Sequence, residues 1–136
     1  MRVFIAGIMQ GSRTDEGIVD QGYRGRITEA LAAHLPDVEV IDPILLYPGS
    51  VDYTPEQAKR ALLDLLERAG RCDVLVAYTP EASMGTALEI WEAYRAGARV
   101  YVISPMSANW VVAHLSHGVF ETIDAFEAFV RGGGMG

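Results

Sequence analysis

The chain has 136 residues, of which 50% are hydrophobic, and it carries a formal net charge of -7 at pH 7. This length suits one domain with a real core, and the hydrophobic content excludes an intrinsically disordered chain. The acidic balance, without a basic patch, argues against a nucleic-acid-binding surface. It leaves room for a small phosphorylated ligand, which needs only one local site.

Cysteine and histidine usage limits the chemistry further. Cys72 is the only cysteine, so no disulfide forms within the chain, and this usage fits a reducing compartment. No Cys/His spacing typical of a zinc site occurs, and we expect neither a metal nor a cofactor. The N-terminal apolar run is too short for a signal peptide, and no long apolar run follows it. We therefore expect a soluble, cytoplasmic protein that does not bind membranes.

Short apolar runs alternate with helical periodicities along the whole chain. Strands are predicted at residues 2–7, 38–41, 74–78, 99–104 and 119–122. Helices are predicted at residues 20–34, 55–69, 84–96, 110–117 and 124–131. The second helix opens with a capping box at Thr54, and Asp124 is the expected cap of the last helix. Residues 43–54 are expected to form a long loop, and residues 132–136 a frayed tail.

Strands that alternate with helices form a parallel sheet covered on both faces. We expect a single domain over residues 1–136 with a three-layer, flavodoxin-like α/β fold and the strand order 2-1-3-4-5. In this order the first and third strands are neighbours. The loops that follow them, at 7–13 and 79–85, then meet over one crevice, and both are rich in small residues.

The strand at 74–78 leads through a short turn into a helix. Pro80 ends the strand, Ser83 can cap the helix, and Gly85 lets a ligand approach the backbone closely. A helix N-terminus at the carboxyl end of a central strand is an anion site. Glu89 follows one turn later, where a carboxylate can act on the molecule to which the anion belongs.

An alternative exists for the same carboxylate, because charged helix residues are usually solvated. Glu89 and Glu92 are three residues apart, and Arg95 follows after three more. In this alternative the three side chains form one solvated helix face and have no chemical role.

Two segments resemble the nucleoside 2-deoxyribosyltransferase family, including its nucleotide N-glycosidase branch. They are residues 4–7 with 11–13, and residues 83–89 with Ala93 and Gly97. The resemblance implies that Glu89 is the nucleophile that attacks C1′ of the sugar. The family has aspartate at the position of Ser83 in transferases and serine in nucleotide hydrolases, which favours a monophosphate substrate here. The substrate-binding residues that it implies are Gly7, Gln10, Gly11, Ser12, Ser83, Gly85, Thr86 and Asn109.

Three positions depart from the family pattern. The family often has a tyrosine near the end of the first strand that touches the nucleophile; this position is Phe4 here, and Tyr78 is the candidate substitute. An arginine of the hydrolase branch corresponds to Gln10. The aspartate that orients the base in the family has its nearest counterpart in Asp64, which is therefore a second candidate catalytic residue.

The helices at 84–96 and 110–117 carry large apolar side chains beyond those that their sheet-facing sides need. These side chains are Ile90, Trp91, Tyr94 and Trp110. An exposed apolar patch of this size predicts a homodimer or a higher homo-oligomer, in line with the family. Family contacts from a neighbouring subunit correspond to positions near Asn109 or Ser116.

The first functional hypothesis is cleavage or transfer at the N-glycosidic bond of a (deoxy)nucleoside or its 5′-monophosphate. Two alternatives stay open. A phosphoribohydrolase of the cytokinin-activating type also has a Gly-Thr-x-x-Glu segment, although residues 80–82 lack the Pro-Gly-Gly run of that family. A non-catalytic nucleotide-binding sensor or scaffold is favoured by Phe4 and Gln10.

Overall fold

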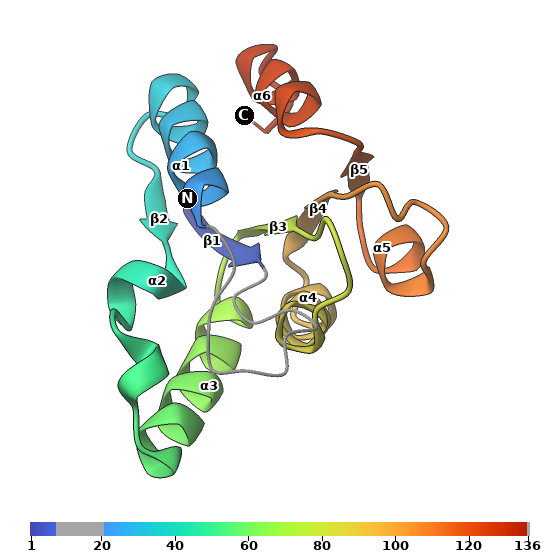
Figure 1. Ribbon diagram of the computed structural model, residues 1–136. Helices are drawn as coiled ribbons and strands as arrows, with labels where there is room; N and C mark the ends of the chain where they lie inside the picture. Colours follow the sequence, from blue (N-terminus) through green and yellow to red (C-terminus); the bar gives the residue numbers. More distant parts are fainter. Residues whose placement is uncertain (8–20, 136) are drawn as a thin grey trace.

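The computed structural model describes residues 1–7 and 21–135, and these residues contain a five-stranded sheet (Figure 1). Its strands are β1 (Arg2–Gly7), β2 (Glu39–Ile41), β3 (Val74–Tyr78), β4 (Arg99–Ile103) and β5 (Gly118–Phe120). Neighbouring strands are parallel, and their order is β2-β1-β3-β4-β5. The predicted strand order is confirmed.

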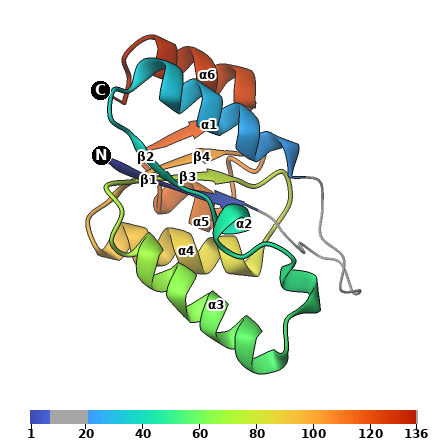
Figure 2. The same ribbon diagram turned by 90° about the vertical axis from the view of Figure 1, so that its left-hand side faces the viewer.

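Helices cover both faces of this sheet. They are α1 (Gly22–His34), α2 (Pro43–Leu46), α3 (Pro55–Ala69), α4 (Met84–Arg95), α5 (Trp110–His114) and α6 (Ile123–Arg131), with a 3₁₀ turn at Ser50–Asp52. Figure 2 shows α1 and α6 on one face, and α3, α4 and α5 on the other. The three-layer α/β architecture is confirmed.

Each central strand buries side chains on both faces, as parallel strands do. In β1, Val3 and Ile5 pack into the core under α1 and α6, whereas Phe4 and Ala6 pack into the core next to α4. All four side chains are fully buried. The apolar runs in the sequence therefore supply two separate cores, one in each layer of helices.

The segment predicted as a long loop at 43–54 begins with a helix, α2, so this prediction was wrong at its start. The carboxylate of Asp42 accepts a hydrogen bond from the amide of Ile44 at 3.1 Å and thereby caps the helix. A proline at the first helical position supports the same start, since its missing N–H would have no partner there.

Asp124 is predicted to cap the last helix, but the cap of α6 is Thr122. The hydroxyl of Thr122 accepts a hydrogen bond from the amide of Ala125 at 3.1 Å. Asp124 lies in the first turn of the helix and binds Arg26 of α1 at 2.6 Å. Threonine and aspartate are both good caps, so only the tertiary contact separates them.

Helix α5 ends at His114, earlier than predicted, because His117 forms hydrogen bonds with the backbone of β4. Its amide donates to the carbonyl of Val100 at 2.7 Å, and its Nδ1 accepts from the amide of Val100 at 3.0 Å. These two bonds bring the chain alongside β4, where β5 begins at the next residue.

The tail predicted to fray is packed as far as the structure describes it. Met135 is 4% exposed and belongs to the core between α1, α6 and the sheet. A Cβ atom on Gly134 would lie 2.2 Å from the ring of Phe129, so the backbone there lies directly on an aromatic side chain. Glycine at this position allows the close approach.

Within the described ranges, no helix combines the length and the apolar character that crossing a membrane requires.

Candidate active site

The predicted crevice requires the carboxyl ends of β1 and β3 to lie side by side, and they do. Gly7 and Tyr78, the last residues of the two strands, are register partners in the sheet. The predicted loop residues Gln10, Gly11 and Ser12 lie outside the described residues. Gly7 itself is described and buried at the end of β1.

The start of α4 has the geometry that the sequence predicted. Ser83 is the N-cap, with an extended backbone, and its Oγ accepts a hydrogen bond from the amide of Thr86 at 3.3 Å. The hydroxyl of Thr86 also donates to Ser83 Oγ, at 2.9 Å. Because Ser83 Oγ accepts twice, its own proton remains to be donated outward. A Cβ atom on Gly85 would meet no atom of the described residues within 4 Å, so none of them fills the space beside this position of the first turn.

Ser83 and Asn109 line the same small cavity, of about 100 Å³, between α4 and α5. Asn109 caps α5 by accepting hydrogen bonds from two amides of its first turn. Thr79 contributes a third polar group to this cavity: its hydroxyl is buried and has no hydrogen-bond partner among the described residues. The sequence analysis missed Thr79, although its place directly after the central strand was a usable signal.

Glu89 is half-buried as a residue, and its carboxylate oxygen Oε2 is fully buried without a hydrogen-bond partner in the described part of the chain. Burial raises the pKa of Glu89 to about 8, and the positive charge of Arg24 opposes this rise. Glu92, by contrast, is bound by Arg95 at 2.8 Å. The alternative of a helix face shared with Arg95 therefore holds for Glu92, which is paired with this arginine, and fails for Glu89, whose Oε2 is buried.

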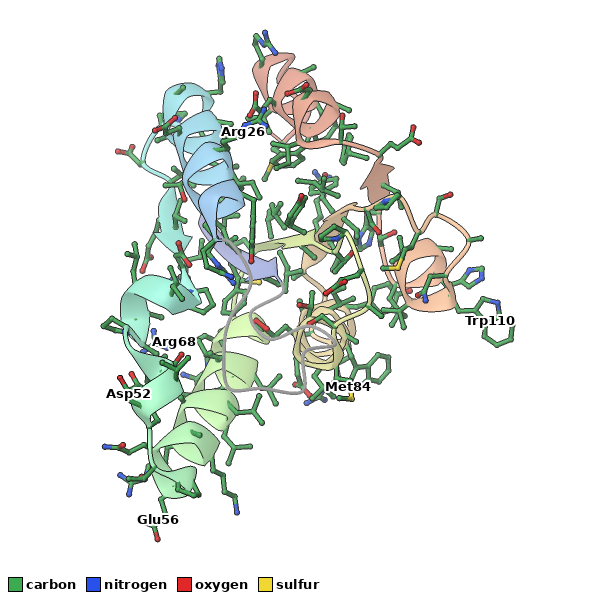
Figure 3. All side chains as sticks on the ribbon, in the orientation of Figure 1. Arg26, Asp52, Glu56, Arg68, Met84 and Trp110 are labelled. Carbon is green, nitrogen blue, oxygen red and sulfur yellow. The ribbon has the colours of Figure 1, made fainter. Side chains whose placement is uncertain are left out.

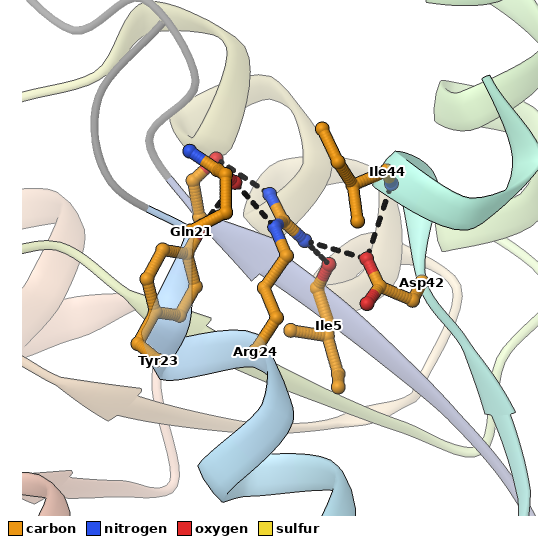
Figure 4. A network of polar contacts seen from close by, with 7 residues as sticks. Ile5, Gln21, Tyr23, Arg24, Asp42 and Ile44 are labelled. Carbon is orange, nitrogen blue, oxygen red and sulfur yellow. Dashed lines mark hydrogen bonds and ion pairs between the residues drawn. The ribbon is translucent and has the colours of Figure 1, made fainter. Parts of the chain in front are cut away.

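A polar network on α1 adjoins the crevice from the other layer (Figure 4). Arg24, only 2% exposed, is bound by Asp42 at 3.1 Å, and its Nη2 donates to the carbonyl of Gly7 at 3.4 Å. Sequence reasoning missed this arginine, which stands in a helix that was predicted only from its apolar spacing.

Two tyrosines meet at the carboxyl end of the sheet. The rings of Tyr23 and Tyr78 have centroids 4.4 Å apart, and the Tyr23 hydroxyl lies against the backbone of Gly7. Burial raises the pKa of Tyr23 far above its usual range, and the field of Glu89 acts in the same direction. Phe4, the position of the family's tyrosine, is fully buried in the core beside α4.

Asp64 lies elsewhere, within α3. Its Oδ2 accepts hydrogen bonds from the hydroxyl of Tyr47 at 2.5 Å and from Nε of Arg68 at 2.9 Å. It lines a different cavity, of about 260 Å³, together with Arg2 at the start of β1. The structure thus brings Ser83, the cap of α4, together with Asn109, but it gives Asp64 other partners.

Metal ligands do not gather in the described residues, where no group of three or more His, Cys, Asp and Glu side chains is placed to hold an ion.

Comparison with solved structures identifies relatives in fold. A 2-deoxyribosyltransferase from Bacillus psychrosaccharolyticus matches with a TM-score of 0.69 and 18% identity, over 93% of this chain and 90% of that chain. A CMP N-glycosidase from Clostridium botulinum matches with a TM-score of 0.56 and 16% identity, over 96% and 98%. A conserved protein from Enterococcus faecalis V583 matches with a TM-score of 0.64 and 15% identity, over 96% and 97%.

No protein-family model and no curated protein matches this chain. At 15–18% identity, the structural matches show a common fold. The chain therefore has the α/β fold that a 2-deoxyribosyltransferase and a CMP N-glycosidase also have.

Proposed function

We propose that this protein cleaves or transfers at the N-glycosidic bond of a nucleoside or nucleoside 5′-monophosphate, with Glu89 as the nucleophile. The observation that carries the proposal is the buried carboxylate of Glu89, unpartnered among the described residues, one turn behind the capped start of α4. The structural neighbours that act on 2-deoxyribosyl groups and on CMP support the same class of reaction.

The proposed chemistry has two displacements. The N-glycosidic bond breaks through an oxocarbenium-like state, whose positive charge a carboxylate below C1′ stabilises. Glu89 forms an ester bond to C1′ while the base leaves with the bonding electrons and takes up a proton. In the second displacement, water or another base attacks C1′ and releases Glu89 as carboxylate.

The start of α4 is the proposed phosphate subsite. The amide of Thr86 is already bound to Ser83, so the first-turn amides of Met84 and Gly85 and the Ser83 hydroxyl are the donors offered to an anion. A Gly85→Val variant is expected to fold, because no described residue lies within 4 Å of the position where its side chain begins, but to lose monophosphate binding. Gly25→Val, a second glycine in a helix with open space around it, is the matched control.

Asp64 remains a prediction as the residue that orients the base. Its present partners, Tyr47 and Arg68, occupy the carboxylate that the resemblance would direct toward the substrate.

The test is incubation of the protein with a panel of deoxynucleosides, ribonucleosides and their monophosphates, followed by chromatography for free base. Glu89→Gln is expected to lose nearly all release of base while it still binds monophosphate. Addition of a second base separates the two branches, since a transferase makes a new nucleoside and a hydrolase does not. Binding without turnover in any substrate would support the sensor alternative, and wild-type turnover in Glu89→Gln would reject the nucleophile.

We also infer that the protein forms a homodimer or a higher homo-oligomer. The α3–α4 surface, defined as Leu62, Leu63, Leu88 and Trp91, leaves 45–54% of each of these side chains exposed on two helices that pack together. Met84 in the first turn of α4 and Trp110 at the start of α5, both labelled in Figure 3, are 85% and 81% exposed. Ile90, one of the residues of the apolar patch predicted from the sequence, is instead buried in the core.

A further inference from the structure

Arg24 is a buried cation whose donors are nearly all used. Its Nε donates to the side-chain carbonyl of Gln21 at 2.6 Å, and its Nη1 donates to the carbonyl of Ile5 and the carboxylate of Asp42, each at 3.1 Å (Figure 4). Its Nη2 reaches the carbonyl of Gly7 at 3.4 Å. A guanidinium held by this many acceptors has one position and cannot swing into solvent.

This fixed position lies at the carboxyl end of β1, a strand that α4, the helix of Glu89, also contacts. The two carbonyls that accept hydrogen bonds from Arg24 belong to Ile5 and Gly7, at the carboxyl end of β1. α4 packs against both β1 and β3, so the helix that carries Glu89 adjoins the same strand from the opposite layer. Arg24 and the helix that carries Glu89 therefore meet β1 from two sides.

Glu89 needs a compensating charge that its own helix does not provide. Its Oε2 is buried and has no hydrogen-bond partner among the described residues, whereas Glu92, the next carboxylate of α4, is bound by Arg95. An isolated buried carboxylate takes up a proton rather than remain charged, and a protonated carboxyl group is a poor nucleophile.

We propose that Arg24 is a positioning residue of the reaction proposed above: its fixed guanidinium is the counter-charge that favours the ionised form of the buried carboxylate of Glu89. The inference rests on the proposed function only for its catalytic meaning. The pairing of charges is a property of the folded protein and can be measured without a substrate.

The electrostatics of the surrounding groups agree with this role. Burial raises the pKa of Glu89 to about 8, and Arg24 is the group that lowers it. The rings of Tyr23 from α1 and Tyr78 from β3 also meet at this end of the sheet. Asp42 is tied to Arg24, so it offsets part of the cation's field.

If Arg24 has only a structural role, removal of its charge leaves the titration midpoint of Glu89 unchanged. If Arg24 is the counter-charge, the midpoint rises. The double variant Arg24→Gln/Asp42→Asn removes both charges of the pair, so that neither residue is left as a buried ion without the other. Asp42→Asn alone keeps the cation. Arg26→Gln is the matched control, because Arg26 lies two residues further on the same helix but is bonded to Asp124 and Glu127 at the surface.

The primary measurement is the titration of the Glu89 carboxyl carbon by NMR in glutamate-labelled protein, assigned by its absence in Glu89→Gln. We expect the midpoint to rise by about one pH unit or more in the double variant, and not to rise in Asp42→Asn or Arg26→Gln. In turnover assays the acid limb of the pH–rate profile is expected to move by the same amount, with activity recovered at higher pH.

A cooperatively melting double variant whose Glu89 midpoint is unchanged would overturn the proposal, as would an equal rise in Arg26→Gln. If the double variant does not fold, Arg24→Lys decides: retention of the wild-type midpoint supports the counter-charge, and a rise as large as that expected for charge loss rejects it. A wild-type protein that releases no base rejects the proposed function but leaves the titration, and hence the pairing of Arg24 with Glu89, to be judged separately.

Discussion

The hydroxyl of Tyr23 occupies the space in which a side chain at position 7 would begin. A Cβ atom on Gly7 would lie 2.0 Å from the Tyr23 hydroxyl oxygen and 2.6 Å from the adjacent ring carbon. The tyrosine has no free space to retreat into, because it is 6% exposed and its ring lies on Tyr78. The glycine at the end of β1 is therefore required by α1, which places its first turn directly on the strand.

Gly7→Ala is expected to destabilise the fold, because the new methyl group forces the Tyr23 ring away from Tyr78. Overpacking of this kind costs about 1–3 kcal/mol. The measurement is urea unfolding followed by circular dichroism. Gly25→Ala is the control, since its Cβ meets open space within α1 and alanine is expected to stabilise that helix by about 0.5–1 kcal/mol. Equal stability of Gly7→Ala and the wild type would contradict the close approach.

The raised pKa of Glu89 predicts that stability falls as the pH rises. In the folded protein Glu89 keeps its proton up to about pH 8, whereas in the unfolded chain it loses the proton near its ordinary pKa of 4.5. The stabilisation from this proton is fully present below about pH 4.5 and is lost as the pH passes through about 8. Glu89→Gln is therefore expected to unfold at a higher denaturant concentration than the wild type at alkaline pH, and at a similar concentration in mild acid.

The control for this experiment is Glu92→Gln, which removes a carboxylate from the same helix that is bound by Arg95. It is expected to keep the pH dependence of the wild type. If Glu89→Gln and the wild type show parallel stability curves between pH 5 and pH 9, about four pH units that span the predicted titration, then Glu89 is not buried as described.

The α3–α4 surface predicts a variant that dissociates the oligomer. Trp91→Lys places a charge on this surface, where Trp91 is 47% exposed in the single chain. Burial of a large apolar side chain contributes about 1.5–3 kcal/mol, so its loss is expected to weaken association by about tenfold or more. Sedimentation velocity over a concentration series measures the change. Leu45→Lys alters an exposed leucine on α2 and is expected to leave association unchanged; a wild-type chain that sediments as a monomer at micromolar concentration would reject the inference.

Asp64→Asn tests whether this residue acts in the reaction or in the fold. Its hydrogen bonds to Tyr47 and Arg68 lie largely at the surface, and the hydrogen bond from Tyr47, followed by that from Arg68, holds the pKa of Asp64 below its usual range. We expect a loss of stability of about 1 kcal/mol or less, and turnover close to that of the wild type. A large fall in kcat with an unchanged melting temperature would instead support a role in orienting the base.

Local patterns in this sequence predict much of the fold. The apolar run of β3, the cap at Ser83 and the capping box at Thr54 all involve residues close together in the chain, and all are present in the structure. The strand order also follows from the alternation of strands and helices, since crossovers between parallel strands have one hand.

The helix that starts at Asp42 was not predicted, and the cap of α6 was predicted at Asp124 instead of Thr122. Local propensity cannot choose between two residues that are both good caps. Contacts from elsewhere decide, as when Arg26 binds Asp124 and leaves Thr122 to cap α6.

The candidate site divides in the same way. Helical periodicity alone places Glu89 one turn behind a capped helix start, so this relation can be predicted from the sequence. The burial of Glu89 Oε2, the ion pair of Glu92 with Arg95, and the contacts of Arg24 and Tyr23 with the end of β1 are properties of the folded chain. Burial and the field of a distant charge depend on which layers of the fold meet at the strand ends, and no spacing along the chain encodes this.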